Sequence, residues 1–264
     1  MADEALHSDR PLVDVHEDAL GVAGLAQNLA RALLRMAPRH GLVMAIYGDW
    51  GTGKTTLINF MRTYLEKHEP ESEKPIIVAF NPWQFSSHQD LIRSYFTELS
   101  LTLSALARAH GAGTSLAGWL QDYTELAEKL AEFGESVGDL PDWVHVATGG
   151  LTKAAGASST ILKGREKPLE TMRTEIEHLL SKQDRKIVVI IDDIDRLTKD
   201  EVRDIFRMVK AVANFPNVIY VLAFDKNVAS RALEADQSLS GSDYIEKIVQ
   251  TTSPEPSGRV GFRG

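Results

Sequence analysis

The residues whose types and spacing most directly predict chemistry are eight consecutive ones, Gly48-Asp49-Trp50-Gly51-Thr52-Gly53-Lys54-Thr55. They match the pattern G-x-x-x-x-G-K-[ST] of a phosphate-binding loop (P-loop), in which glycines let backbone N–H groups turn inward around phosphate oxygens. We expect Lys54 to contact the β and γ phosphates of ATP or GTP and the Thr55 hydroxyl to ligate Mg²⁺. We add Thr56 to the expected nucleotide-binding residues.

Two carboxylates, Asp192 and Asp193, follow the apolar run Ile187-Val188-Val189-Ile190-Ile191. This is the form of a Walker B strand. Asp192 would hold Mg²⁺ beside Thr55, and Asp193 would orient and polarise the water that attacks the γ-phosphate. An ordinary acidic turn is the alternative. We favour the Walker B interpretation because the two motifs supply a phosphate grip and a metal ligand for one site.

A third acid, Asp225, ends the apolar run Val218 to Phe224. We expect this run to be a strand between the phosphate-loop strand and the acidic strand, so that Asp225 approaches the γ-phosphate as a sensor residue does. A helix N-cap before Lys226-Asn227-Val228 is a serious alternative, and both roles can hold at once. For Asp195 and Arg196 we favour a local ion pair that shapes the loop over a contact between the arginine and phosphate.

Strands that alternate with helices must position these residues. The short or fully apolar runs predict strands, since a parallel strand is covered on both faces, and the 3.6-residue periodicity of apolar residues predicts helices. The pattern favours an α/β fold with right-handed βαβ units and a parallel sheet. Expected strands are 42–47, 75–80, 186–192 and 218–224; expected helices are 22–36, 55–67, 90–108, 120–133, 170–182, 199–214 and 227–234.

The chain reads as one P-loop domain over residues 18–250, after an N-terminal tail of residues 1–17. Residues 104–168, between the two Walker motifs, predict a helical insertion. Residues 251–264 are rich in Ser, Pro and Gly and predict a disordered or truncated C-terminal tail, which could impair hydrolysis while nucleotide binding survives.

The composition narrows the functional class. The 264 residues are 43% hydrophobic and 25% charged, with a net charge of −8 and no cysteine. Disulfides and thiolate metal sites are excluded, and no strong nucleic-acid signal is present. The N-terminus cannot serve as a signal peptide, and no uninterrupted apolar stretch predicts a membrane span. We therefore expect a cytoplasmic protein.

Four segments together resemble one family. They are the phosphate loop itself, Phe80-Asn81-Pro82-Trp83-Gln84-Phe85, Ile191-Asp192-Asp193-Ile194-Asp195-Arg196-Leu197 and Leu222-Ala223-Phe224-Asp225-Lys226. The chain resembles the KAP family of P-loop NTPases from about Asp18 to Gln250. The phosphate loop is shared by many proteins, whereas the combination of all four segments is far more specific.

The expected strand 75–80 between the phosphate loop and the acidic strand suggests the division of P-loop proteins with an added catalytic acid. The resemblance implies that the bound nucleotide is ATP rather than GTP. It also implies slow or regulated hydrolysis, a role as a switch or assembly module that recruits a protein partner or self-associates, and, for bacterial members, a link to phage or plasmid exclusion or defence. Many members carry membrane helices between the Walker motifs, whereas residues 110–165 here are too polar to span a membrane.

Several residues near these motifs allow two interpretations. We expect Phe80, Trp83 and Phe85 to be buried in the core and leave the role of Asn81 open. Trp50 could shield phosphates, although packing against the protein is the simpler expectation. The segment Asp18 to Gly21 resembles one that lines adenine in related ATPases, or it caps the next helix; both interpretations have equal weight.

Other functions on the same fold stay open. A nucleotide-binding scaffold without turnover would share every motif. A small-molecule kinase would need an arginine-bearing lid, and Arg231 stands alone after the strand 218–224. A transporter-type ATPase would carry its signature before the acidic strand, whereas Ser238-Leu239-Ser240-Gly241 follows it, and we interpret that segment as a flexible turn.

Overall fold

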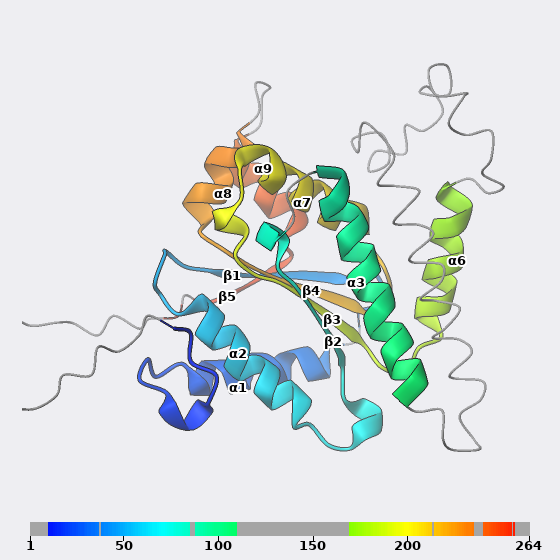
Figure 1. The fold of residues 1–264 in the computed structure, drawn as a ribbon, viewed down its shortest axis with the longest axis horizontal. Coiled ribbons are helices and arrows are strands. Elements are labelled where there is room, and N and C mark those ends of the chain that lie inside the picture. The colour runs from blue at the N-terminus through cyan, green and yellow to red at the C-terminus, as the bar shows by residue number, and fades with distance from the viewer. Residues whose placement is uncertain are drawn as a thin grey trace, which may run out of the picture.

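A five-stranded, entirely parallel sheet forms the centre of the protein in a computed structural model (Figure 1). The structure describes residues 10–36, 38–84, 88–109, 169–212, 214–234, 240–254 and 256. The expected helix 120–133, most of the expected insertion and Phe85 lie outside these residues. The strands are β1 (Leu42–Tyr47), β2 (Ile76–Phe80), β3 (Ile187–Ile191), β4 (Val218–Phe224) and β5 (Thr251–Ser253).

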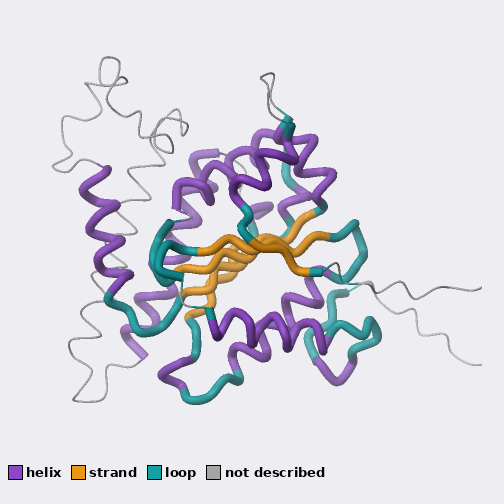
Figure 2. The backbone as a smooth tube through the Cα atoms, turned by 180° about the vertical axis from the view of Figure 1, so that it is seen from behind, coloured by secondary structure: helices purple, strands orange, loops and turns teal. Residues whose placement is uncertain are grey.

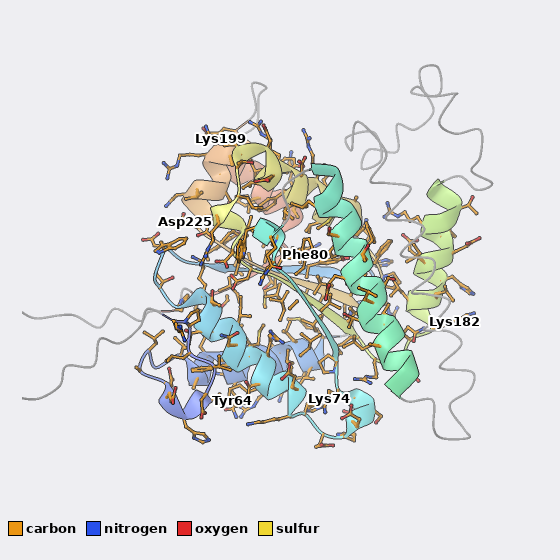
Figure 3. The ribbon with its side chains drawn as sticks, viewed as in Figure 1. Tyr64, Lys74, Phe80, Lys182, Lys199 and Asp225 are labelled. Atoms are coloured by element: carbon orange, nitrogen blue, oxygen red, sulfur yellow. The ribbon has the colours of Figure 1, made fainter. Side chains whose placement is uncertain are left out.

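The order of the strands is β2-β3-β4-β1-β5, so β4 lies between β1 and β3. This is the arrangement that the sequence predicts for a P-loop fold with an additional strand. In a parallel sheet all carboxyl ends meet at one edge. The loops after β1, β3 and β4, which carry the phosphate loop, Asp192 and Asp225, are therefore neighbours. Figure 3 labels Phe80, the last residue of β2, and Asp225, the first residue after β4.

Helices cover both faces of the sheet, as the edge-on view in Figure 2 shows. On one face lie α1 (Ala23–Arg35) and α2 (Lys54–Glu66). Helices α3, α6, α7, α8 and α9 contribute to the core on the other face. Their bounds are α3 (His88–Ala109), α6 (Leu169–Ser181), α7 (Lys199–Val212), α8 (Lys226–Leu233) and α9 (Gly241–Ile248).

Two hydrophobic clusters, one on each face, result from the alternation of side chains along the strands. The α1–α2 cluster includes Ala26, Leu33, Leu57, Phe60, Met61, Ile190 and Val221. The α3–α9 cluster includes Phe80, Tyr95, Ile176, Phe206, Tyr220, Phe224 and Ile245. All positions of β3 and β4 are buried, which fits the unbroken apolar runs that predicted them.

Charged side chains fix both ends of α1 against the sheet. The Asp18 carboxylate accepts hydrogen bonds from the backbone N–H groups of Val22 (3.1 Å) and Ala23 (2.9 Å). At the other end, Lys186 Nζ donates to the carbonyls of Leu33, Leu34 and Met36. These bonds satisfy orphan groups of the helix termini and place opposite charges at the two ends of the helix dipole. The capping interpretation of Asp18 is thus observed directly.

Two elements near the C-terminus differ from the expectation. The sequence places Ser240 and Gly241 in a flexible turn, but Ser240 is the N-cap of α9, where its hydroxyl accepts a hydrogen bond from the Asp243 N–H (3.1 Å). A Cβ on Gly241 would lie 1.9 Å from the Ser230 carbonyl oxygen, so glycine lets α9 pack closely on α8. Thr251–Ser253, which the sequence places in a C-terminal tail, form β5 and pair with β1.

Candidate nucleotide-binding site

The phosphate loop connects β1 to α2 and turns through glycines. Gly51 and Gly53 have φ values of +79° and +89°, a region that residues with a Cβ rarely adopt. The Thr52 hydroxyl donates to the Asp49 carbonyl (2.9 Å) and closes the turn. Because α2 begins at Lys54, its unpaired N–H groups and the positive end of its dipole lie at the loop, which suits an anion.

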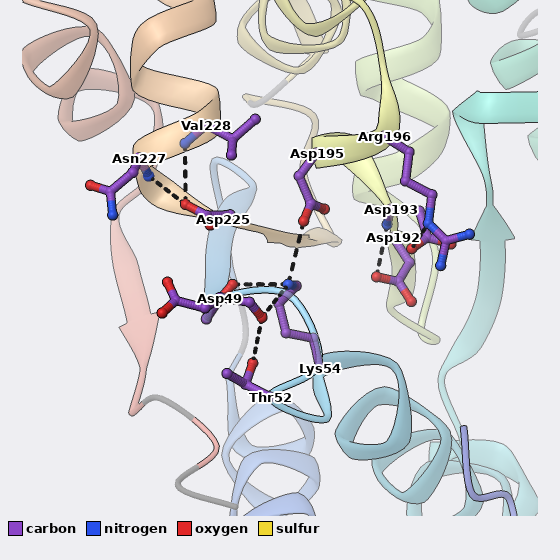
Figure 4. Close-up of polar contacts among 11 residues, drawn as sticks. Asp49, Thr52, Lys54, Asp192, Asp193, Asp195, Arg196, Asp225, Asn227 and Val228 are labelled. Carbon is purple, nitrogen blue, oxygen red and sulfur yellow. Dashed lines mark hydrogen bonds and ion pairs between the residues drawn. The ribbon is translucent and has the colours of Figure 1, made fainter. Parts of the chain in front are cut away.

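Lys54 is buried at the base of this loop. Its ammonium donates to the carbonyls of Gly48 (2.9 Å) and Asp49 (3.1 Å), both in the loop itself. It also forms an ion pair with Asp195 Oδ2 at 3.5 Å (Figure 4). The sequence predicts Lys54 as a phosphate ligand, and the structure adds that protein oxygens surround its charge.

Thr55 and Asp192 meet across the sheet edge although they are far apart in the sequence. The Thr55 side chain interacts with the Asp192 carboxylate closely enough to lower the pKa of that group, and the carboxylate accepts a hydrogen bond from the Asp193 N–H (2.8 Å). Burial raises the pKa of Asp192 above its usual range, while the hydrogen bonds and the nearby Lys54 oppose that shift. A hydroxyl beside a buried carboxylate is a donor set that Mg²⁺ accepts, since this ion uses few protein ligands together with phosphates and waters.

No cluster of three or more His, Asp or Glu residues in the described part of the chain could hold a metal by itself. The Thr55 hydroxyl and the Asp192 carboxylate are the two protein groups here that fit Mg²⁺, an ion that takes most of its remaining ligands from phosphates and waters.

Asp193, which the sequence predicts to orient the attacking water, forms an ion pair with Arg196 in this structure. It adopts a left-handed backbone conformation (φ 58°), and its Oδ1 lies 2.8 Å from Arg196 Nε. The Arg196 guanidinium carbon lies 4.8 Å from the centre of the Trp50 ring. Arg196 thus bridges the acidic turn to the tip of the phosphate loop. The local pair expected between Asp195 and Arg196 is wrong, because Asp195 pairs with Lys54 and Arg196 with Asp193.

Asp225 caps α8. Its Oδ1 accepts from the backbone N–H groups of Asn227 (2.8 Å) and Val228 (3.1 Å), which is the N-cap interpretation left open by the sequence (Figure 4). The cap places Asp225 at the end of β4, at the same sheet edge as Lys54. Its predicted role as a γ-phosphate sensor stays a prediction.

The segment that precedes α1 lies against the phosphate loop and α2. The Thr56 hydroxyl accepts from the Leu12 N–H (3.1 Å), so this residue, expected to bind nucleotide, also anchors the N-terminal segment. A Cβ on Gly53 would lie 2.7 Å from Leu20 Cδ1. The stretch from Asp18 to Gly21 is therefore close to the loop, although a contact with adenine stays a prediction.

The aromatic residues near the motifs fall into a buried group and an exposed group. Phe80 is buried as expected, and its ring stands edge-on to Tyr95. The expectation of a buried Trp83 is wrong, since this side chain is 48% exposed on the short 3-10 helix η3 (Pro82–Gln84) after β2. Trp50 is 66% exposed and contacts Arg196 rather than the core. Asn81 is exposed beside η3, and Phe85 lies outside the described residues.

Asp195 is the site residue that the sequence did not assign. It lies on the 3-10 helix η6 (Ile194–Arg196), directly after the acidic pair. The signal that could have identified it is its position: an acid two residues after the acidic pair, on a strand-end turn that must face the phosphate loop. Spacing alone does not show which carboxylate reaches Lys54.

A parallel α/β sheet with this loop between strand β1 and helix α2 defines the class of P-loop nucleotide-binding proteins. Comparison with known families agrees, because the family model described as the KAP family P-loop domain matches residues 22–253. The chain therefore belongs to the KAP family of P-loop NTPases.

One curated relative is the phage T7 exclusion protein of Escherichia coli (strain K12). The two sequences are 26% identical over 263 residues, an alignment that covers 94% of this chain and 34% of the relative. The chain thus spans about a third of the length of the relative that it matches. Within the described helices, none combines the length and the apolar character that crossing a bilayer requires.

Proposed function

We propose that this protein binds Mg-ATP at the loop Gly48 to Thr55 and hydrolyses ATP to ADP and phosphate as a regulated switch or assembly module. The observation that carries the proposal is the proximity of Thr55, in the phosphate loop, to the buried Asp192 carboxylate at the end of β3. The choice of ATP over GTP rests on membership of the KAP family.

Each residue would have a defined task. Lys54 would neutralise charge on the β and γ phosphates, and Thr55 with Asp192 would hold Mg²⁺, which offsets phosphate charge when bound. Asp193 would accept a hydrogen bond from the attacking water and orient it. For this, Asp193 must release at least one oxygen from Arg196, whose side chain is 44% exposed, so that water can replace the lost hydrogen bond.

The charges around the site support dependence on a divalent cation. Lys54 and Arg196 face the carboxylates of Asp192, Asp193 and Asp195, so the acids outnumber the bases before any nucleotide enters. A bare triphosphate would add several negative charges beside them. Since unpaired charges in a partly buried site are costly, the phosphates should bind only with a cation.

Binding and turnover can be tested separately. Calorimetry should detect Mg-ATP binding to the wild-type protein and a loss of at least about 100-fold in affinity for Lys54→Ala, because a charge-assisted contact to two phosphates disappears. Lys67→Ala, an exposed lysine at the other end of α2, is the matched control and should bind normally. No calorimetric signal with any nucleoside triphosphate, on folded protein, would refute the proposal.

Turnover should depend on Asp193. In a phosphate-release assay, Asp193→Asn should lower the rate by about 100-fold or more while Mg-ATP still binds, because the variant cannot polarise the water. An unchanged rate would favour the second candidate, a nucleotide-binding scaffold without turnover. One observation favours that candidate: protein groups already pair with Lys54 and Asp193 in this structure.

The similarity to the phage T7 exclusion protein supports a further proposal, that this protein acts in phage exclusion. A bacterial strain that expresses it should show a reduced efficiency of plating for a susceptible phage, and Lys54→Ala should restore plating. Equal plating on both strains would remove this biological assignment and leave the biochemical one intact.

A further inference from the structure

The ion pair between Lys54 and Asp195 lies where the proposed function needs a free ammonium. The side chains are only 10% and 6% exposed, so solvent screens the pair little. The two residues come from the phosphate loop and from η6, and the pair closes the space between these segments. A buried carboxylate without a cationic partner would be strongly destabilising, and Lys54 is the cation that pairs with Asp195.

The hydrogen-bonding capacity of Lys54 is filled in this arrangement. An ammonium has three protons, and Lys54 Nζ contacts three oxygens: Gly48 O, Asp49 O and Asp195 Oδ2. Phosphate oxygens at the loop would need at least one of those protons. They would also add negative charge close to the Asp195 carboxylate, where the low exposure makes repulsion strong.

We propose that Asp195 is an internal competitor of the nucleotide, which occupies Lys54 in the nucleotide-free protein and is displaced when the β and γ phosphates bind. This inference rests on the proposed function, since it assumes that a nucleotide binds at Lys54. Asp195 then sets affinity: only the fraction of molecules with Lys54 released is competent to bind.

Displacement of Asp195 has a direct structural consequence. Asp195 and Arg196 are adjacent on η6, and Arg196 holds both Asp193 and the face of Trp50. A movement of Asp195 away from Lys54 shifts the same short turn. Exchange of the Lys54 partner is thereby coupled to release of Asp193, so the two ion pairs change together when a nucleotide enters.

The test compares affinities of Asp195→Asn and its controls by calorimetry with Mg-ATP. Asp195→Asn removes the charge at nearly constant shape, and we expect roughly tenfold tighter binding than wild type. Asp195→Glu keeps the charge and should show no such gain. Asp200→Asn removes a charge on the first turn of α7, from a side chain that is 88% exposed, and should bind as wild type does.

The rate constants of nucleotide binding distinguish an Asp195 that leaves Lys54 when the nucleotide binds from an Asp195 that stays paired with Lys54 in the complex. With a fluorescent N-methylanthraniloyl ATP in stopped flow, Asp195→Asn should raise the association rate constant roughly tenfold and leave the dissociation rate constant unchanged, because Asp195 no longer touches Lys54 in the complex. A change confined to the dissociation rate constant would overturn the inference. A purely structural role for Asp195 would move neither constant in this pattern.

The outcomes separate this inference from the proposed function. Wild-type binding with equal or weaker binding by Asp195→Asn refutes the competitor role and leaves the nucleotide site standing. Absence of binding by both proteins, each shown to be folded by circular dichroism, refutes the proposed function and the inference with it. Tighter binding by Asp195→Asn, absent from Asp195→Glu and Asp200→Asn, supports both.

Discussion

Gly53 shows how one backbone position serves the site. Its φ of +89° turns the chain so that α2 can begin at Lys54, and Leu20 packs against the place that a Cβ would take. A left-handed conformation costs a residue with a side chain roughly 1–2 kcal/mol, even without a clash. The glycine of the loop pattern is therefore required by geometry in the protein alone, before any phosphate is considered.

Gly53→Ala should accordingly lower the free energy of unfolding by at least about 1 kcal/mol, through left-handed strain and the contact with Leu20. Urea denaturation measures the change. Gly24→Ala is the matched control: Gly24 lies in α1 with open space around its Cβ position, so alanine should stabilise the protein by about 0.5 kcal/mol. Equal effects of the two substitutions would contradict this account.

The sequence predicts the individual site residues unevenly. Lys54 and Thr55 are predicted by the fixed spacing of the phosphate-loop pattern, and Asp192 is predicted because the carboxyl ends of parallel strands meet at one edge of a sheet. The partners of Asp193 and Asp195 do not follow, since they depend on the left-handed turn at Asp193, which directs neighbouring side chains to opposite partners. Local spacing carries no information about that turn.

At the scale of elements, a pair of buried tyrosines joins α3 to the centre of the sheet. Tyr95 on α3 and Tyr220 on β4 are hydrogen-bonded through their hydroxyl groups (3.3 Å), and the Tyr220 hydroxyl also lies 3.3 Å from the Val212 carbonyl at the end of α7. Burial raises the pKa of both phenols above their usual range. Three elements thus meet at one buried polar contact.

This pair should make the protein sensitive to alkali. In the unfolded chain the tyrosines ionise near pH 10, whereas in the folded protein they stay protonated to higher pH. Their contribution is therefore fully present below about pH 10 and falls as pH rises above it, by up to about 1.4 kcal/mol per pH unit for each group.

Denaturation at several pH values above 10 should show a shallower loss for the double variant Tyr95→Phe/Tyr220→Phe than for wild type. The double change avoids leaving one hydroxyl buried without its partner. Tyr64→Phe, at a partly exposed position on α2, should retain the wild-type slope. Parallel slopes for all three proteins would show that other groups govern the alkaline transition.

Most described elements follow from the sequence for clear reasons. The strands β1, β3 and β4 are unbroken apolar runs, and α1 and α7 carry strong amphipathic patterns, so burial decides their type. The amphipathic and apolar patterns do not predict two elements, α9 and β5. Helix α9 begins with a glycine, which is needed for close packing against α8, and β5 consists of three polar residues that form a strand through pairing with β1.

At the scale of the whole molecule, ligand binding should appear as global stability. A ligand that binds only the folded state at 100 times its Kd adds about 2.7 kcal/mol. For a chain of this size that corresponds to a rise in Tm of roughly 5–10 °C. Mg-ATP should produce this shift in a thermal-denaturation assay, and ATP with EDTA should produce much less, because the acids around Lys54 oppose a bare triphosphate.

Lys54→Ala should lose most of the shift with Mg-ATP, because a 100-fold weaker affinity reduces the added stability to about 0.4 kcal/mol, and Lys67→Ala should retain the full shift. An equal shift in Lys54→Ala would place the bound nucleotide elsewhere on the protein. A shift of the same size with EDTA would contradict the electrostatic argument for a divalent cation.

The division of β4 between two hydrophobic clusters has a consequence for how this fold tolerates change. Successive residues of the strand serve opposite faces, so each layer of side chains has its own set of neighbours. Substitutions that repack the core on the side of α3 and α6 should leave the packing of the side chains beneath α1 and α2 unchanged. The core on the side of α3 and α6 can thus be rebuilt while the side chains beneath the phosphate loop and α2 keep their packing. The strand residues on the two sides are Val218, Tyr220, Leu222 and Phe224 against Ile219, Val221 and Ala223.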